Sequence, residues 1–213
     1  MKFQATNEHS VGAISITWLV AEATNSEACF KTRQVMEGRE SKEQHSEHSG
    51  KPEKDYSLVF VLRNTNGNTI FNAERDAEVM LGMKKRGFGA GKINGYGGKL
   101  EKGETMDQCA IRELQEESAL VARSVQRVGF LKFNMHNKIM NVHVYTTADW
   151  SGEAVETDEM KPNWVSCDTL PLNQMWPDDK FWLPLVMAGK KVLARFDYDD
   201  DEETILSHEV REV

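Results

Sequence analysis

The sequence lacks the features that mark membrane, secreted and zinc-binding proteins. No run of apolar residues approaches the roughly 20 that are needed to span a bilayer. Cys29, Cys109 and Cys167 are scattered, so they form neither a Cys-x-x-Cys pair nor a zinc-binding spacing. No Asn-x-Ser/Thr glycosylation site occurs. These absences predict a protein with reduced thiols in the cytoplasm, with the mitochondrial matrix and the nucleus as alternative compartments.

An excess of positive charge is also missing. The 213 residues include 26 lysines and arginines against 34 aspartates and glutamates, which gives a formal net charge of −8. Proteins that follow a nucleic-acid backbone are usually basic, so the composition argues against a nucleic-acid polymer as partner. A small phosphate-bearing substrate remains compatible, because a divalent cation can supply local positive charge. We expect a monomer without a membrane partner.

Residues 1–54 differ in composition from the rest of the chain. The segment 37–54 consists almost entirely of charged and small polar residues and has little to bury. We therefore predict a disordered N-terminal extension over residues 1–54 and a single domain over residues 55–213. Residues 11–21 form a short apolar run without a clear signal-peptide cleavage site. For this run, a short strand, a short helix and an extension without function all remain open.

Apolar and β-branched runs alternate with turn signals through the rest of the chain, which predicts a mixed β-sheet. Asn66-Gly67 is a hairpin signal, and residues 69–77 are expected to be irregular. Strands separated by two helices indicate an α/β fold, a sandwich with a mixed sheet. The predicted strands are Tyr56–Leu62, Glu78–Lys85, Val125–Met135, Ile139–Thr147, Trp164–Ser166, Val192–Tyr198 and Thr204–Val210, and the later helix spans Asp178–Met187.

The stretch from Gly98 to Leu120 carries the clearest chemical signal in the chain. Thr105 and Gln108 have the spacing of a capping box, so a helix is expected to begin at Thr105. An apolar stripe would place one side of this helix against a core. The stripe consists of Cys109, Ala110, Ile111 and Leu114.

Three glutamates, Glu113, Glu116 and Glu117, stand at i, i+3 and i+4 and therefore share one face of this helix. Like charges at these spacings cost about 0.2–0.5 kcal/mol per pair. A bound Mg²⁺, or Mn²⁺ as the alternative, would remove this repulsion because hard cations take carboxylate oxygens as ligands. Arg112 is placed to hold the Glu113 carboxylate and to pair with Glu104. Taken alone, the three glutamates are also compatible with a solvated acidic helix end.

The spacing of the whole stretch is more restrictive than the glutamates alone. A glycine, five residues, a glutamate, seven residues and Arg-Glu-aliphatic-x-Glu-Glu run from Gly98 to Glu117. This string resembles the signature of the Nudix hydrolases. The resemblance implies their α/β/α sandwich with a loop–helix–loop, and hydrolysis of a nucleoside diphosphate linked to another group. The chain departs from the signature at Ala119, where the family has glycine. Glycine tolerates positive φ at a helix end, so Ala119 is expected to shift that end without removing a ligand.

Three further strings resemble the animal Nudix hydrolases that act on oxidised purine nucleoside triphosphates. They lie at residues 81–98 (with L-G-M-K-K-R-G-F-G-A-G-K and N-G-Y-G-G), 158–164 (D-E-M-K-P-x-W) and 175–179 (M-W-P-D-D). The similarity covers residues 56–213. It implies metal-dependent release of a nucleoside monophosphate and pyrophosphate from substrates such as 8-oxo-dGTP and 2-hydroxy-dATP, which keeps damaged bases out of DNA.

The resemblance also implies roles for residues at matching positions. Glu113, Glu116 and Glu117 are the implied catalytic and metal-binding glutamates, with Glu117 expected to activate water. Glu159 and the Gly97 carbonyl would complete the metal shell. Implied nucleotide contacts comprise phosphate-binding and purine-binding groups. They are Ser57, Lys84, Phe88, Asn94, Tyr96, Gly97, Gly98, Lys99, Phe133, Met160, Trp176, Pro177, Asp178 and Asp179.

The last of these strings makes physical sense as a purine site. Trp176 offers an aromatic face on which a purine can stack. Asp178 and Asp179, if buried side by side, should not both ionise, so one is expected to keep a proton. The pair would then present one donor and one acceptor to the edge of the base. For Pro177-Asp178-Asp179 alone, helix capping is the alternative interpretation, and Trp176 could equally be a core residue.

Two other functional classes stay open from the sequence. One is a Nudix hydrolase of a different nucleoside diphosphate-linked substrate. The other is a Nudix domain that binds nucleotides without catalysis, which usually lacks signature glutamates that this chain retains. A calcium loop at Asp197–Asp201 is excluded, because Glu202 stands where the required glycine should be. That segment is predicted to be a solvated hairpin turn.

Overall fold

A computed structural model describes residues 50–64 and 77–213 of the chain. The predictions for residues 1–49, for the hairpin signal Asn66-Gly67 and for most of the irregular segment 69–77 lie outside the described residues. Among the helices of the described part, none is both long enough and apolar enough to cross a membrane.

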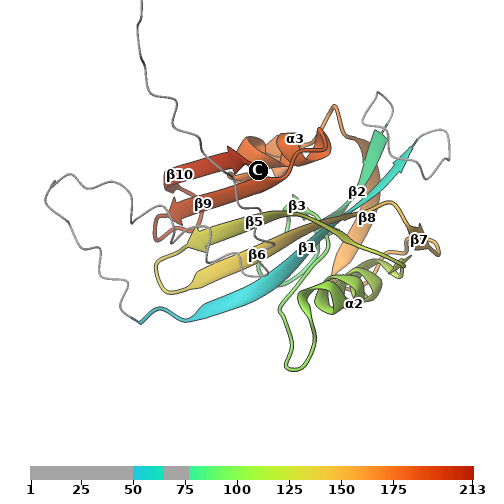
Figure 1. Cartoon of the computed structure of the whole chain (residues 1–213), viewed down its shortest axis with the longest axis horizontal. Helices are drawn as coiled ribbons and strands as arrows, with labels where there is room; N and C mark the ends of the chain where they lie inside the picture. Colours follow the sequence, from blue (N-terminus) through green and yellow to red (C-terminus); the bar gives the residue numbers. More distant parts are fainter. Residues whose placement is uncertain (1–49, 65–76) are drawn as a thin grey trace, which may run out of the picture. The chain divides into compact units, whose positions relative to one another are not determined.

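Eight strands form one sheet. They are β1 (Glu53–Asn64), β2 (Ala77–Lys84), β3 (Ile93–Asn94), β5 (Gln126–Asn134), β6 (Ile139–Thr147), β8 (Met160–Ser166), β9 (Val192–Tyr198) and β10 (Ile205–Glu212). The order is β10-β9-β5-β6-β1-β2-β3, with β8 paired to β2 (Figure 1). The pairs β1–β6 and β5–β9 are parallel and the others antiparallel, so the sheet is mixed, as predicted. The short strands β4 (Val121–Ala122) and β7 (Trp150–Ser151) pair separately.

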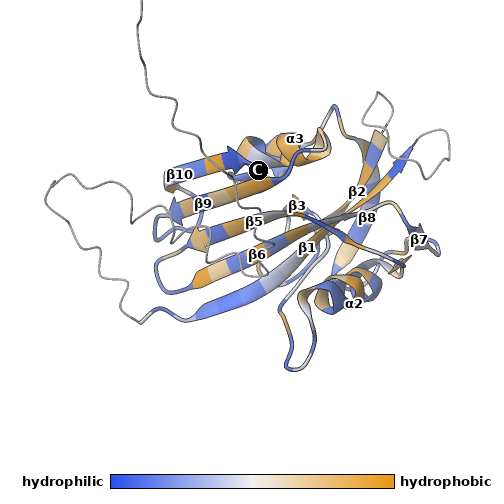
Figure 2. Ribbon diagram, viewed as in Figure 1, coloured by the Kyte–Doolittle hydropathy of each residue, from blue (hydrophilic) through white to orange (hydrophobic). Residues whose placement is uncertain are grey.

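Helices cover both faces of this sheet. Helix α2 (Met106–Ser118) packs against β1 and β8, and helix α3 (Asp179–Met187) packs against β9 and β10. Alternate residues of β1 enter the two layers: Phe60 shares a core cluster with Trp182 of α3, whereas Val59 shares one with Leu114 of α2. Figure 2 shows β1 as hydrophilic at its start and hydrophobic along its middle, as expected of a strand that is covered on both faces. The predicted α/β/α sandwich is therefore confirmed.

Two strand boundaries differ from the prediction by more than two residues. β1 begins at Glu53, not at Tyr56, because its polar start pairs with β6 from Ile139 onward. β8 begins at Met160, not at Trp164, because residues 160–163 pair with β2. Pro162 weakens the sequence signal for a strand in that stretch, but a proline is tolerated where the strand lies at an edge of the sheet. Both errors concern polar segments whose pairing is set by a distant strand.

Helix α2 begins as its sequence predicts. Thr105 is the N-cap residue, and its hydroxyl accepts a hydrogen bond from the backbone N–H of Gln108. The Gln108 side chain accepts one from the backbone N–H of Thr105, which completes the capping box. At the other end, Ala119 adopts left-handed φ of 63° and its N–H donates to the Gln115 carbonyl. Ala119 therefore keeps the helix end that glycine would form, at a cost in backbone strain, so the expected shift of that end is wrong.

We expect the substitution Ala119→Gly to stabilise the protein. Left-handed geometry costs an L-residue roughly 1–2 kcal/mol, and glycine removes this cost while losing more entropy on folding. The net gain in the free energy of unfolding should be about 0.5–1 kcal/mol, measurable by urea denaturation with an unchanged m-value. A lower midpoint for the variant would contradict the strain at this position.

Candidate active site

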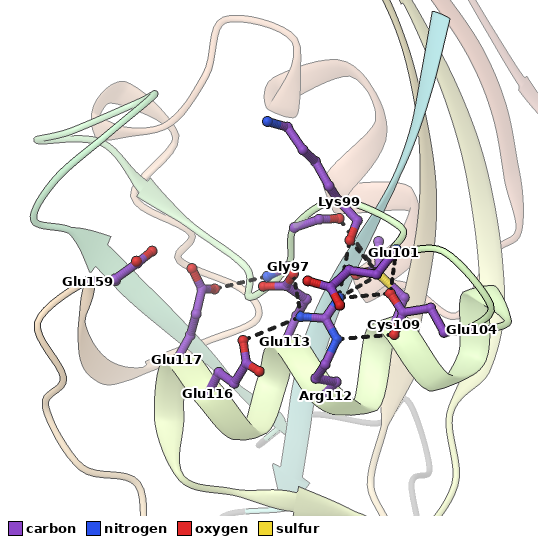
Figure 3. A network of polar contacts seen from close by, with 12 residues as sticks. Gly97, Lys99, Glu101, Glu104, Cys109, Arg112, Glu113, Glu116, Glu117 and Glu159 are labelled. Carbon is purple, nitrogen blue, oxygen red and sulfur yellow. Dashed lines mark hydrogen bonds and ion pairs between the residues drawn. The ribbon is translucent and has the colours of Figure 1, made fainter.

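An arginine-centred network joins the middle of α2 to the loop before it (Figure 3). Arg112 donates two hydrogen bonds to Glu104, of 2.8 Å and 3.0 Å. The same guanidinium donates to Glu113 at 2.9 Å and to Glu116 at 3.3 Å, and to the Lys99 carbonyl at 3.1 Å. The expected pairing of Arg112 with Glu104 and Glu113 is confirmed. Because Arg112 fixes the loop on the helix, the backbone of residues 97–99 lies directly beside the glutamates.

Glu117 is the most enclosed of the three helix glutamates. Its residue is 5% exposed, and one carboxylate oxygen accepts a hydrogen bond from the Gly97 N–H at 3.0 Å. The other oxygen lies 2.7 Å from the Lys84 ammonium, which also lies 3.2 Å from Glu159. Three elements distant in sequence, β2, α2 and the loop before β8, therefore meet at Lys84.

A small turn positions Glu159. The Thr157 hydroxyl accepts hydrogen bonds from the backbone N–H groups of Glu159 and Met160, at 3.2 Å and 3.1 Å. Such hydroxyl-capped turns fix the backbone locally. Thr157 also donates to the Glu117 carbonyl at 3.3 Å, which ties this turn to the end of α2.

Two adjacent glycines permit the close packing of loop and helix. A Cβ atom on Gly97 would overlap the backbone carbonyl of Ser57, and one on Gly98 would overlap the Glu113 carboxylate. The backbone approach is fixed by the Ser57 N–H, which donates to the Gly98 carbonyl at 2.9 Å. A side chain at position 97 would therefore collide with rigid backbone, whereas a side chain at position 98 would displace the Glu113 carboxylate.

The electrostatics of the network follow from burial and from these ion pairs. Burial raises the pKa of Glu113, and the neighbouring charges of Glu117 and Glu116 act in the same direction, against Arg112. Hydrogen bonds from Arg112 lower the pKa of Glu104 to about 2. Burial alone would lower the pKa of Lys84, but its ion pairs with Glu117 and Glu159 leave that pKa raised. Lys84 therefore stays charged while it faces the carboxylates.

The donor set of this network suits a hard divalent cation. It offers the carboxylates of Glu113, Glu116, Glu117 and Glu159 and the Gly97 carbonyl, and oxygen is the ligand that Mg²⁺ and Mn²⁺ prefer. Within the described ranges, no three acidic, histidine or cysteine side chains converge on one point. Lys84 and Arg112 lie among them instead, as the ion-pair distances show. A cation bound to this set would take over the contacts that Lys84 makes.

A cavity of about 660 Å³ opens next to the network. Most of the residues with an implied role line it. They are Ser57, Lys84, Phe88, Asn94, Gly97, Gly98, Lys99, Phe133, Met160, Trp176, Asp178 and Asp179, together with Glu113, Glu117 and Glu159.

Three residues with an implied role lie outside this lining. Tyr96 pairs with Val59 and is fully buried in the core layer beneath α2, so its side chain faces away from the cavity. Burial raises the pKa of Tyr96, which keeps its hydroxyl neutral. Glu116 is exposed on α2 and is held by Arg112, and Pro177 is half-buried before α3.

The carboxyl pair Asp178 and Asp179 also lines the cavity, and both residues are buried. Asp178 accepts hydrogen bonds from the Trp182 indole at 2.8 Å and from the Tyr198 hydroxyl at 2.6 Å. Asp179 accepts one, from the Trp176 N–H at 2.9 Å. Burial raises the pKa of Asp179 well above its ordinary value, and the charge of Asp178 raises it further. Burial also raises the pKa of Asp178, but hydrogen bonds from Tyr198 and Trp182 oppose that rise, so a proton that the pair retains is expected on Asp179.

The substitution Asp179→Asn should remove a pH dependence of stability. A raised pKa means that the folded protein holds this proton more tightly than the unfolded chain. Stability therefore falls as pH rises from the unfolded pKa, about 3.8, through the folded pKa. Each unit of pKa shift costs about 1.4 kcal/mol above the folded pKa. The variant should gain stability over the parent as pH rises from 4 to 8 in denaturation curves. Parallel curves for the two proteins would contradict a proton on Asp179.

Sequence reasoning missed the groups that orient this pair. Trp182 lies on α3 and Tyr198 ends β9, and neither belongs to the strings that pointed to the site. The alternation of β9, in which Phe196 and Tyr198 face one layer, is the signal that could have placed Tyr198 there. Lys92 was also missed: its ammonium lies 4.7 Å from the centre of the Trp176 ring.

Comparison with known proteins places this site in a family. The NUDIX domain matches residues 58–186. The chain is 44% identical over 160 residues to the oxidized purine nucleoside triphosphate hydrolase of Mus musculus, covering 74% of this chain and 94% of that protein. Its identity to the enzyme of the same name from Danio rerio is 42% over 147 residues, or 68% and 94% of the two chains.

A solved structure shares the fold. The crystal structure of a mutator MutT protein from Bacillus halodurans superposes with a TM-score of 0.59 at 20% identity, over 74% of this chain and 97% of that one. At this identity the likeness supports the architecture of sheet and helices.

Proposed function

The chain belongs to the NUDIX domain family, and we propose that it hydrolyses oxidised purine nucleoside triphosphates to the nucleoside monophosphate and pyrophosphate. The observation that carries this proposal is the set of residues that line the 660 Å³ cavity. Glu113 and Glu117 line it together with the glycine-rich loop, and so do Trp176, Asp178 and Asp179. Two relatives over 40% identical are named for this activity, and they match this chain over 94% of their own length.

We propose Mg²⁺ as the cation, held by Glu113, Glu116, Glu117, Glu159 and the Gly97 carbonyl. When bound, it would neutralise phosphate charge and acidify a water. Glu117 would accept the proton of the attacking water, since its carboxylate is fixed by the Gly97 N–H. The water oxygen would bond to phosphorus, and the bond between the first and second phosphates would break. Lys84, freed from Glu117 and Glu159, and Lys99 would bind phosphate oxygens.

Base selection would rest on the protonation of the carboxyl pair. Asp179 would donate and Asp178 would accept at the edge of the purine, beside the aromatic wall that Trp176 forms with Phe88. A pocket with one donor and one acceptor discriminates by leaving a buried group unpaired when the wrong base enters. This activity would remove oxidised purine nucleotides from the nucleotide pool. We propose that the enzyme is a monomer in the cytoplasm.

The deciding experiment compares turnover of 8-oxo-dGTP and dGTP, with Mg²⁺ present or chelated, and resolves pyrophosphate from phosphate. We expect metal-dependent pyrophosphate release with a strong preference for the oxidised base. Activity without base preference would confine Asp178 and Asp179 to a structural role, since Asp178 binds Trp182 and Tyr198 but its side chain makes no capping bond to α3. Absence of turnover in folded protein would redirect the proposal to other nucleoside diphosphate-linked substrates or to binding without catalysis.

A further inference from the structure

The acidic turn between β9 and β10 is ordered by its own side chains. Asp201 accepts hydrogen bonds from the backbone N–H groups of Glu203 and Thr204, at 2.8 Å and 2.7 Å, and from the Thr204 hydroxyl at 2.6 Å. Glu202 occupies left-handed φ of 56°. The turn is a hairpin, as predicted, but its two glutamates point to partners in other segments.

Two ion pairs connect this turn to the rim of the cavity. Glu203 lies 2.9 Å from Lys92, which precedes β3, and Glu202 lies 2.9 Å from Lys138, in the turn between β5 and β6. We call these four side chains the clasp. Each pair is partly exposed, so the clasp adds little to the stability of the fold.

Both lysines of the clasp also lie over an aromatic ring of the cavity wall. The Lys92 ammonium is 4.7 Å from the centre of Trp176, and the Lys138 ammonium is 4.5 Å from the centre of Phe88. Phe88 and Trp176 stack on one another, with ring centres 4.9 Å apart and planes 22° apart. Ammonium groups at such distances are attracted to the ring face. The acidic turn is thus linked to both rings of this aromatic pair.

Phe88 needs such support more than most cavity residues. It is 49% exposed, and it lies between Gly87 and Gly89, which both adopt positive φ. A half-exposed ring on a glycine-rich loop loses conformational freedom when a ligand orders it, and that loss weakens binding. Contacts that order the ring beforehand reduce this cost.

We propose that the clasp is a positioning element for purine recognition: its glutamates hold the two lysines over the aromatic pair and so preorganise the wall that receives the base. This inference rests on the proposed function, because it concerns the affinity of the same cavity for its purine ligand. It assigns a role to the acidic turn, which lies outside the signature strings and makes no contribution to the chemistry at Glu117.

The test uses the full chain with Glu202→Gln and Glu203→Gln combined, and Glu212→Gln as the matched control. Glu212 pairs with Lys190 at 3.4 Å and neither residue lines the cavity. The ligands are 8-oxo-dGTP for turnover and 8-oxo-dGMP for binding by calorimetry without metal. We expect the clasp variant to raise KM and the Kd of the monophosphate about threefold to tenfold, with kcat changed less than about twofold.

A double-mutant cycle separates positioning from a general charge effect. Lys92→Met and Glu203→Gln should each weaken monophosphate binding, and the double variant should weaken it no more than Lys92→Met alone, because the two groups act as a unit. High salt should shrink the difference between parent and clasp variant. Additive losses, unchanged affinity in the clasp variant, or an equal loss in Glu212→Gln would overturn the inference while leaving the proposed function intact. Failure of the parent protein to bind or hydrolyse either nucleotide would overturn both.

Discussion

Replacing Glu117 with glutamine should lower kcat for 8-oxo-dGTP about 1,000-fold, within the usual range for loss of a general base. The substitution removes the charge that would accept a proton from water. An amide oxygen can still accept the Gly97 N–H bond that Glu117 makes at 3.0 Å, so the loop should stay in place. Steady-state kinetics with pyrophosphate detection would measure the loss, and circular dichroism would report on the fold.

The matched control for this experiment is Glu156→Gln. Glu156 is half-exposed and pairs with Lys85 at 2.8 Å, outside the network around Arg112. The control should retain kcat within about twofold, since exposed ion pairs contribute little. If Glu117→Gln turned over substrate as fast as this control, proton acceptance would have to be reassigned to another group of the network.

The substitution Gly97→Ala should lower the stability of the fold, whereas Gly98→Ala should lower turnover. At Gly97 the new Cβ meets the rigid carbonyl of Ser57, so we expect a loss of about 3 kcal/mol in the free energy of unfolding. At Gly98 it meets the end of the flexible Glu113 side chain, which can move away. Gly98→Ala should keep the fold within about 1 kcal/mol while turnover falls about tenfold to a hundredfold, because a proposed cation ligand is displaced.

Thermal unfolding and metal titration distinguish the two variants. A loss of 3 kcal/mol corresponds to a lower Tm by about 6–12 °C in a protein of this size. Gly98→Ala should lower Tm by no more than about 4 °C and require more Mg²⁺ for half-maximal rate. Similar unfolding temperatures for both variants would mean that the backbone at Ser57 moves to make room for the new Cβ atom. That outcome would contradict the rigidity expected from its hydrogen bond to Gly98.

The parts of the molecule that sequence predicted well are those with local causes. The capping box at Thr105 fixes the start of α2 through bonds between residues three apart, so its signal is complete in the sequence. The alternation in β9 reflects burial on one face, and both β6 and β9 begin and end where predicted. The pairing of Arg112 with Glu104 likewise follows from one loop folding back on one helix.

What sequence did not predict depends on contacts between distant segments. The burial of the Tyr96 side chain follows from its backbone pairing with Val59, and the glycine-rich string does not predict that pairing. Lys84 faces Glu117, 33 residues away, because β2 lies beside the end of α2. The clasp joins three separate turns, and only the folded chain brings Lys92 within reach of Glu203.

Successive side chains of β1 enter the two core layers in turn, and this limits where the chain can gain or lose residues. Because Phe60 and Val59 enter opposite layers, deleting one residue within β1 would exchange the two layers downstream of the deletion. The acidic turn and the turn at Lys138 carry no such constraint, since they connect neighbouring antiparallel strands. Insertions and deletions among related proteins should therefore occur in turns and not in β1. Substrate preference would then diverge through the lengths of the loops around the cavity.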